Sequence, residues 1–288
     1  MAPAEIFPAI SMARVTFTRF LLLFAVWPTN ALQLHIAATQ QAPVLRLGAS
    51  ASSRLLSTRM SVAEPAPPAT IWLRQAGAMW MIAALLGPLC DGCHSRHDVL
   101  HYATDSIAGA PWLLYGPDGR QLLETMWWVP IAFGGAGLIL GVAHPLLDRR
   151  WDGGPRAPPG WTSALVNTAS FVATYELSGV LAQAAAARGG AHDYLSVDLP
   201  LLACAVAIYA TFERPQRGGL FMMTLLAIIG PLVEILLING PHLYAYTHPD
   251  VAGIPTWIPW VYAAGGPANG ALGRQILHDL QQQQGRDA

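Results

Sequence analysis

The chain has 288 residues, of which 53% are hydrophobic and only 11% are charged, and its mean hydropathy is +0.37. A soluble chain carries about 25% charged residues, so this composition indicates a membrane protein and excludes an ordinary soluble domain. The formal net charge of −1 excludes the strongly basic class of nucleic-acid-binding proteins. Three cysteines are too few for a disulfide framework.

Residues 1–69 have the composition of a targeting leader followed by a short linker. Arg14 and Arg19 precede an apolar run at 20–27, and Ala31 then offers a small residue for cleavage. This order of charge, apolar core and small residue is typical of a signal peptide. A signal anchor that stays attached to the protein is the alternative interpretation.

A second feature of the leader is its lack of acidic residues between Glu5 and Glu64, where arginine is interspersed with serine, alanine and glutamine. That composition is typical of a transit peptide. A signal peptide followed by a transit-like segment resembles the two-part leader of plastid proteins in algae with complex plastids, which favours a plastid membrane. A true start at Met60 would remove both parts.

Six apolar segments follow the leader. About 20 apolar residues cross the hydrocarbon layer of a bilayer as a helix, and most of these segments approach that length. The six expected spans are residues 71–89, 127–147, 161–187, 197–212, 220–239 and 257–273. The sequence therefore predicts an all-α polytopic membrane protein, with six transmembrane helices in one bundle over residues 70–277 and a polar tail at 278–288.

Small residues and loop charges predict how these spans are arranged. Gly137 and Gly141 lie on one helical face, as do Gly266 and Gly270, and such faces let a neighbouring helix approach closely. Seven arginines follow the even-numbered spans or lie in the tail: Arg149, Arg150, Arg156, Arg214, Arg217, Arg274 and Arg286. On the opposite side there are Arg96, Arg120 and Arg188. The positive-inside rule places both ends of the six-span domain on the cytosolic or stromal side.

The orientation conflicts with a signal peptide cleaved in the endoplasmic reticulum, which would leave the mature N-terminus in the lumen. Import into a plastid, an uncleaved leader, or a start at Met60 would each remove the conflict.

The stretch after the first expected span contains Cys90, Cys93, His94 and His97. C-x-x-C-H is the attachment sequence of c-type haem, and two thiolates with two imidazoles would also suit zinc. A polar interfacial loop with free thiols explains the same residues, and such short motifs arise often by chance. We therefore treat these four residues as weak metal candidates and expect no metal and no cofactor.

Two carboxylates lie well inside the expected spans, away from their ends, where a charge costs about 2.5 kcal/mol or more. Glu176 shares a helical face with Gln183, so we expect that face to point into the bundle. Glu234 follows Gly230 and Pro231, where a loosened turn can line a cavity. These carboxylates either line a site for a lipid head group or transported solute, or hydrogen-bond between helices as protonated acids. No phosphate-binding loop and no Ser-His-Asp arrangement stands out, so we expect no enzymatic activity.

Several short motifs occur in a fixed order between Trp127 and Leu277. They are W-W-V-P at 127–130, H-P-L-L-D at 144–148, T-F-E-R at 211–214, N-G at 239–240, Y-T-x-P-D at 246–250, and W-x-P, G-G and G-R-Q between 257 and 275. Each motif is weak alone, but together they resemble the Insig family of endoplasmic-reticulum sterol-regulatory proteins.

The resemblance implies a six-helix membrane protein without catalytic activity. Animal members of the family bind oxysterols among their helices, retain the escort protein Scap and bring HMG-CoA reductase to degradation. By resemblance, we expect this chain to bind a sterol or other lipid in its bundle and to regulate or retain another membrane protein, with self-association left open. The candidate lipid- or partner-binding residues are Trp127, Trp128, Glu176, Gln183, Glu234, Asn239, Trp257 and Asn269.

The chain also departs from the family pattern. An acidic residue important for partner binding in the animal proteins aligns with Ala182, although Asp193 lies in the following loop. A family glutamine becomes Glu234, and the family's N-H becomes Tyr175-Glu176. The alternatives are a small-solute or proton-coupled carrier, or a plastid membrane protein with another role. A carrier needs a Glu234 that water reaches from both sides, whereas a lipid sensor needs a groove that opens sideways to the bilayer.

Overall fold

The computed structural model describes residues 66–189, 193–213 and 216–287, and the compact unit that they form begins at Pro67. The leader expected at 1–69 therefore lies almost entirely outside the described residues. The elements, in chain order, are α2 (Ala69–Ser95), β1 (Leu100–Tyr102), β2 (Trp112–Tyr115), β3 (Gln121–Thr125), α3 (Trp128–Trp151), α4 (Trp161–Ala187), α5 (Asp198–Ile208), the π-helical turn η2 (Tyr209–Glu213), α6 (Arg217–Asn239), β4 (Tyr244–Tyr246) and α7 (Ile258–Asp287).

A helix forms in or near each of the six expected spans, so the mainly helical, multi-pass membrane fold is confirmed. Three of the described helices, α2, α3 and α6, are long and apolar enough to cross a bilayer by themselves. The count of six crossings stays a prediction. The sequence also suggests a break at Pro200, near the start of the fourth segment, but α5 begins at Asp198 and its first turn tolerates a residue without an N–H.

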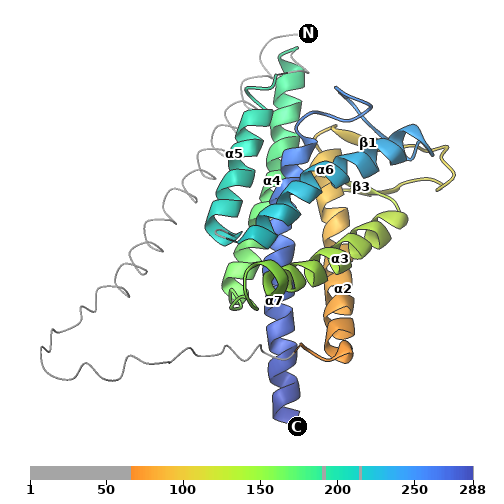
Figure 1. The fold of residues 1–288 in the computed structure, drawn as a ribbon. Helices are drawn as coiled ribbons and strands as arrows, with labels where there is room; N and C mark the ends of the chain where they lie inside the picture. Colours follow the sequence, from red (N-terminus) through yellow and green to blue (C-terminus); the bar gives the residue numbers. More distant parts are fainter. Residues whose placement is uncertain (1–65, 190–192, 214–215, 288) are drawn as a thin grey trace, which may run out of the picture. The chain divides into compact units, whose positions relative to one another are not determined.

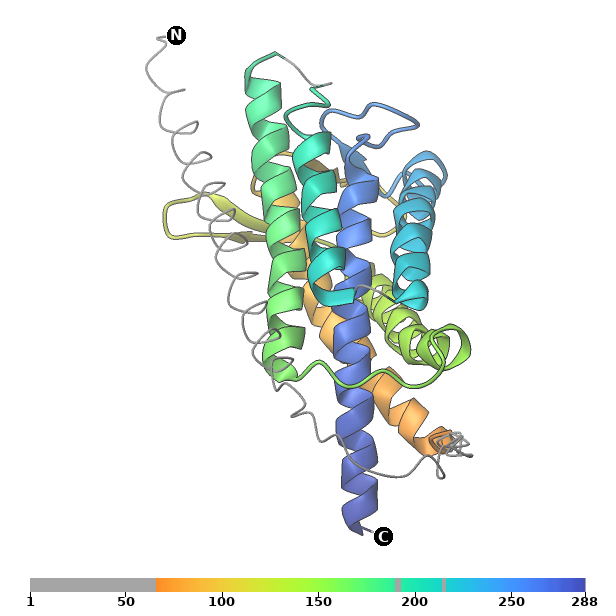
Figure 2. The same ribbon diagram turned by 60° about the vertical axis from the view of Figure 1, so that its left-hand side comes forward.

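Helix α7 runs through the middle of the bundle, with the other helices packed around it (Figures 1 and 2). Its segment from Ala263 to Leu277 is almost entirely buried. This segment is rich in glycine and alanine, which let neighbouring helices approach the α7 backbone closely. Helix α3 crosses α2 and α7 obliquely and joins this central contact.

The glycine faces predicted from the sequence lie at these contacts. A Cβ atom on Gly137 would lie 2.2 Å from the Ala83 Cβ of α2. A Cβ on Gly266 would lie 3.1 Å from the Met223 Cα of α6, and one on Gly270 would lie 2.7 Å from His144 Nδ1 of α3. Any larger residue at these positions would force the helices apart.

Two small antiparallel sheets accompany the predicted helices. β1 pairs with β4, with Leu100 opposite Tyr246, and β2 pairs with β3 as a hairpin. Their strands are only three to five residues long, and β1 pairs with a strand far away in the sequence, so local patterns did not reveal them.

Two helix ends also differ from the prediction. Helix α2 continues to Ser95, so Cys90, Cys93 and His94 are helical and buried instead of lying in a loop. Helix α7 continues to Asp287, so the polar tail expected at 278–288 extends the last helix. The tail contains four glutamines, one leucine and one arginine, which are good helix formers and explain the extension.

The start of α2 and the end of α7 lie at one end of the bundle, together with the connection between α3 and α4 (Figure 1). The two small sheets and the connection from α4 to α5 lie at the other end. The helices therefore alternate in direction as the predicted topology requires.

Candidate functional site

A cavity of about 230 Å³ lies between α3 and α6, and the sheet formed by β1 and β4 contributes to its wall. Its sides are apolar where Ala132 and Ala136 of α3 face Ile229 and Val233 of α6. These four residues are also exposed on the outer surface of the helices. In a membrane this surface faces lipid, so the cavity opens sideways toward the bilayer.

A smaller cavity of about 70 Å³ adjoins the first and shares Phe133, Ala136 and Tyr262 with it. It reaches Asn269 of α7, whose amide donates a hydrogen bond to the Gly265 carbonyl at 2.9 Å. The two cavities thus share part of their walls, and most of the residues that line them are apolar or aromatic.

Glu234 forms a polar group in the wall of the larger cavity. It is buried, and its two carboxylate oxygens accept hydrogen bonds from the hydroxyl groups of Tyr246, at 2.6 Å, and Tyr262, at 2.7 Å. Gly230, one turn earlier in α6, makes room for this arrangement, because a Cβ there would lie 2.2 Å from the Tyr262 ring. Helix α6 continues through Pro231 without interruption, so the expected break is absent while the expected cavity is present.

Asp91 is a second carboxylate in the cavity wall, and no sequence pattern marked it as part of this site. Its Oδ2 accepts hydrogen bonds from Tyr102, at 2.8 Å, and from Thr125, at 2.6 Å. Burial raises the pKa of the Tyr102 phenol well above its ordinary value, and the neighbouring charge of Asp91 raises it further. Tyr102 therefore stays protonated and donates.

Trp128 provides an unused hydrogen-bond donor in the same wall. Its ring stacks on Tyr244 at a centroid distance of 6.2 Å and meets Tyr102 edge-on at 5.9 Å. Its indole N–H is buried and has no partner among the described residues. The walls of the cavity thus contain carboxylate acceptors and a tryptophan whose indole N–H is unpartnered among the described residues.

The other predicted site residues lie elsewhere. Trp127 is exposed and donates to the Ala108 carbonyl at 3.0 Å, while Asn239 donates to the Ile235 and Ala252 carbonyls at 2.8 Å each. Both residues hold loops at the ends of helices.

The prediction that Glu176 faces the bundle interior is wrong. Glu176 is about one-third exposed and pairs with Arg96, at 2.6 Å, and His97, at 2.9 Å, beyond the end of α2. Gln183 bonds the other ring nitrogen of His97 at 3.2 Å. Arg96 and His97 stabilise the Glu176 carboxylate at a partly exposed position, so it does not require a partner in the bundle interior.

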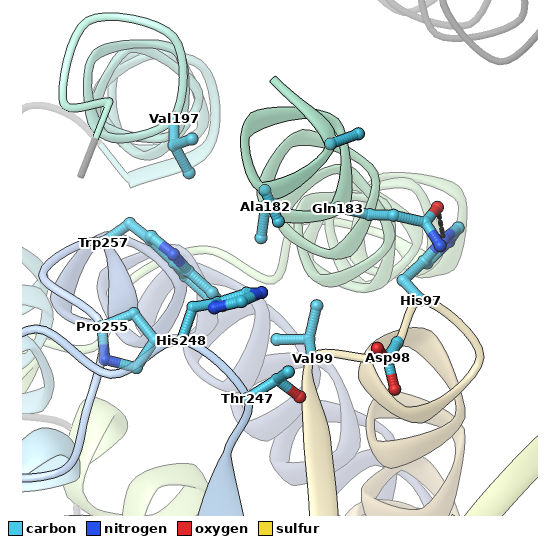
Figure 3. Close-up of a pocket in the computed structure, with 12 residues that line it drawn as sticks. His97, Asp98, Val99, Ala182, Gln183, Val197, Thr247, His248, Pro255 and Trp257 are labelled. Atoms are coloured by element: carbon cyan, nitrogen blue, oxygen red, sulfur yellow. Dashed lines mark hydrogen bonds between the residues drawn. The ribbon is translucent and has the colours of Figure 1, made fainter. Parts of the chain in front are cut away.

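Gln183, His97 and Trp257 line a third cavity of about 240 Å³ (Figure 3). Ala182 of α4 lines it as well. This cavity lies at the end of the bundle that carries the sheets, and Glu234 is absent from its wall.

The histidines among the weak metal candidates hydrogen-bond to other side chains. His94 bonds Ser178 at 2.9 Å, and His97 is held by Glu176 and Gln183. Within the described ranges, no three His, Cys, Asp or Glu side chains are grouped so as to hold a metal ion. The absence of covalent haem at Cys90 and Cys93 stays a prediction.

A buried ionic cluster lies at the opposite end of the bundle from the two sheets. Arg274 of α7 contacts Asp148 of α3 at 2.5 Å and Glu213 of η2 at 2.7 Å. Arg156 contacts Glu213 at 3.3 Å from the loop after α3. The sequence signal for this cluster was present in the motifs H-P-L-L-D, T-F-E-R and G-R-Q, each of which contributes one of its charges.

The fold defines a multi-pass helical membrane protein with a cavity between α3 and α6. No family model matches the chain. It is 30% identical over 165 residues to the insulin-induced gene 2 protein of Gallus gallus, and the matched region covers 57% of this chain and 68% of the relative. It is also 30% identical over 164 residues to the insulin-induced gene 2 protein of Xenopus laevis, which covers 57% of this chain and 71% of the relative. The chain therefore belongs to the insulin-induced gene protein (Insig) family.

Two further comparisons agree with this assignment. The insulin-induced gene 1 protein of Danio rerio is 29% identical over 157 residues, covering 54% of this chain and 58% of the relative. A crystal structure of a cross-linked trimer of the protein MvINS has a TM-score of 0.55 at 21% identity, covering 71% of this chain and 94% of that one. This second likeness shows the shared fold.

Proposed function

We propose that this protein is a non-enzymatic regulator that binds a hydroxylated lipid, such as a sterol or diacylglycerol, in the cavity between α3 and α6. Lipid binding would then alter its association with another membrane protein. One observation carries the proposal: a cavity that opens sideways between α3 and α6 has apolar walls around buried polar groups.

The chemistry of the polar groups favours a hydroxyl on the ligand. A hydroxyl group can donate to a carboxylate and accept from an N–H at the same time. Glu234 offers the acceptor and the indole of Trp128 the unpartnered donor. The apolar walls take the lipid body, whose burial contributes about 25 cal/mol per Å² of apolar surface.

A proton-coupled or small-solute carrier is the competing function. A carrier must expose its coupling residue to water from each side in turn, but Glu234 is only 7% exposed and lies beside a lateral opening. This geometry favours the lipid-binding function.

For localisation, family membership favours the endoplasmic-reticulum membrane. The plastid alternative depends on the leader, which lies outside the described residues, and the relatives give it no support. Localisation of a fluorescent fusion of the full chain separates the two.

The test is photo-crosslinking of the purified full-length protein with a sterol probe and a diacylglycerol probe, beside a flux assay in proteoliposomes. Glu234→Gln should keep lipid capture, because an amide can still accept a hydrogen bond and the family carries glutamine there. Ala136→Trp should reduce capture at least several-fold by filling the cavity.

The matched control is Ile139→Trp, which adds the same ring to an exposed position of the same helix outside the cavity walls. It should leave capture unchanged. Flux that depends on Glu234, without capture of either probe, would refute the proposal in favour of the carrier.

A further inference from the structure

The β2–β3 hairpin carries large apolar side chains that the described part of the chain leaves uncovered. All four residues of β2, Trp112, Leu113, Leu114 and Tyr115, are 48% to 58% exposed. Leu122 of β3 is 42% exposed. In both ribbon views the hairpin, drawn in yellow, projects away from the helices (Figures 1 and 2). An apolar surface of this kind marks an interaction site.

Both faces of β2 are apolar, which indicates what covers them. Successive strand residues point to opposite faces, so Trp112 and Leu114 share one face while Leu113 and Tyr115 share the other. A folded protein partner would cover one face and leave the other in water. Lipid molecules of the bilayer that the helices cross can surround the strand and contact both of its faces.

The base of the hairpin holds it at the level where helices begin and end. The Glu124 N–H donates to Ser95 Oγ, in the last turn of α2, at 3.0 Å, and Glu124 Oε1 accepts from the Tyr102 N–H at 2.7 Å. Helix α3 begins at Trp128, three residues after β3 ends. The hairpin is therefore fixed beside the helix ends, where a membrane surface is expected.

The backbone groups of the hairpin determine how deep in a bilayer it can lie. Among the described strands, β2 pairs only with β3, so its outer edge has N–H and C=O groups that no described strand pairs with. The hydrocarbon core does not tolerate such groups, but the hydrated headgroup layer does. Tryptophan and tyrosine are enriched in that layer because their rings are apolar and their N–H or O–H groups are polar.

The charged residues of the hairpin contribute little to a contact with the headgroup layer. The turn of the hairpin carries Asp118 and Arg120, which pair with each other at 3.4 Å, and Glu124 is buried at the base. A contact driven by apolar area does not require anionic lipid.

We propose that the β2–β3 hairpin is an interfacial membrane anchor, inserted in the headgroup layer on the side of the bilayer opposite the start of α2. This anchor is independent of the lipid cavity, and it precedes the region that carries the Insig motifs.

The test uses the full-length protein in phosphatidylcholine vesicles with a nitroxide on Leu114→Cys. The native cysteines are buried, so they leave the introduced thiol to react. Power-saturation electron paramagnetic resonance then compares collisions with oxygen, which concentrates in lipid, and with a water-soluble nickel chelate. We expect an oxygen-to-nickel ratio several-fold higher at Leu114 than at Ala157→Cys, an exposed control in the loop after α3, and no change when salt is raised.

Two results would overturn the proposal. Nickel access at Leu114 equal to that at Ala157 would show that the hairpin stands in water. Low access to both reagents would show that protein covers it, either a second copy of the chain or another partner.

Discussion

At the scale of single residues, the strongest constraint is the buried cluster around Arg274. Its guanidinium lies between Asp148 and Glu213, and both carboxylates are almost inaccessible. The three side chains come from α7, α3 and η2, so one arginine joins three elements that are far apart in the sequence. If one member of such a buried cluster is removed, the remaining charges lose the partner that stabilises them. The cluster therefore stabilises the structure only while all its members are present.

Arg274→Met should therefore lower the free energy of unfolding by roughly 3–5 kcal/mol, the typical cost of leaving a buried charge without its partner. Arg156, at 3.3 Å, and His144, at 3.6 Å, would then be left beside Glu213, and Asp148 would lose its arginine partner. The measurement is reversible unfolding in mixed micelles. The control is Arg286→Met near the exposed end of the same helix, and equal stability of the two variants would contradict the structural role of the cluster.

At the scale of elements, helix α7 determines how closely the bundle packs. A Cβ on Gly273 would lie only 2.3 Å from the carbonyl oxygen of Gly141 in α3, and a backbone atom cannot move aside as a side chain can. The same helix contains Gly285, which has open space around it. Position 273 therefore has no room for a side chain, whereas position 285 in the same helix does.

Gly273→Ala should destabilise the protein by about 1–3 kcal/mol, because the added methyl group overpacks the contact between α3 and α7. Gly285→Ala should be neutral or stabilise by up to about 1 kcal/mol through helix propensity alone. Thermal unfolding in detergent compares the two variants. A loss of stability in Gly285→Ala, or none in Gly273→Ala, would be incompatible with this packing.

At the scale of the whole molecule, the helices alternate in direction, and the arginine-rich connections gather at the end where α2 starts. The prediction that follows concerns the two sides of the membrane. Ala157 lies in the loop after α3, and Val251 lies between β4 and α7, at opposite ends of the bundle.

Single cysteines at Ala157 and Val251 should react with a membrane-impermeant maleimide from opposite sides of sealed microsomes. Ala157→Cys should be labelled from the cytosolic side, because the positive-inside rule places the arginine-rich loops there. Val251→Cys should be labelled only after the membrane is opened. Labelling of both from one side would disprove the topology.

The sequence by itself determined the membrane class, the approximate position of each helix, the glycine faces and the family. These features depend on local composition and spacing, or on short motifs in order. It could not separate Glu176 from Glu234, because both are carboxylates in apolar helices and their sequence signals are alike.

The tertiary structure decided that difference. Arg96 and His97 pair with Glu176 near the surface, whereas Tyr246 and Tyr262, from β4 and α7, enclose Glu234 in the cavity wall. The tertiary structure also shows that α2 continues past Asp91 to Ser95, although the polar residues there suggested that the helix ends earlier. A buried polar group goes where its hydrogen-bond partners are, and those partners come from segments whose approach only the packed bundle defines.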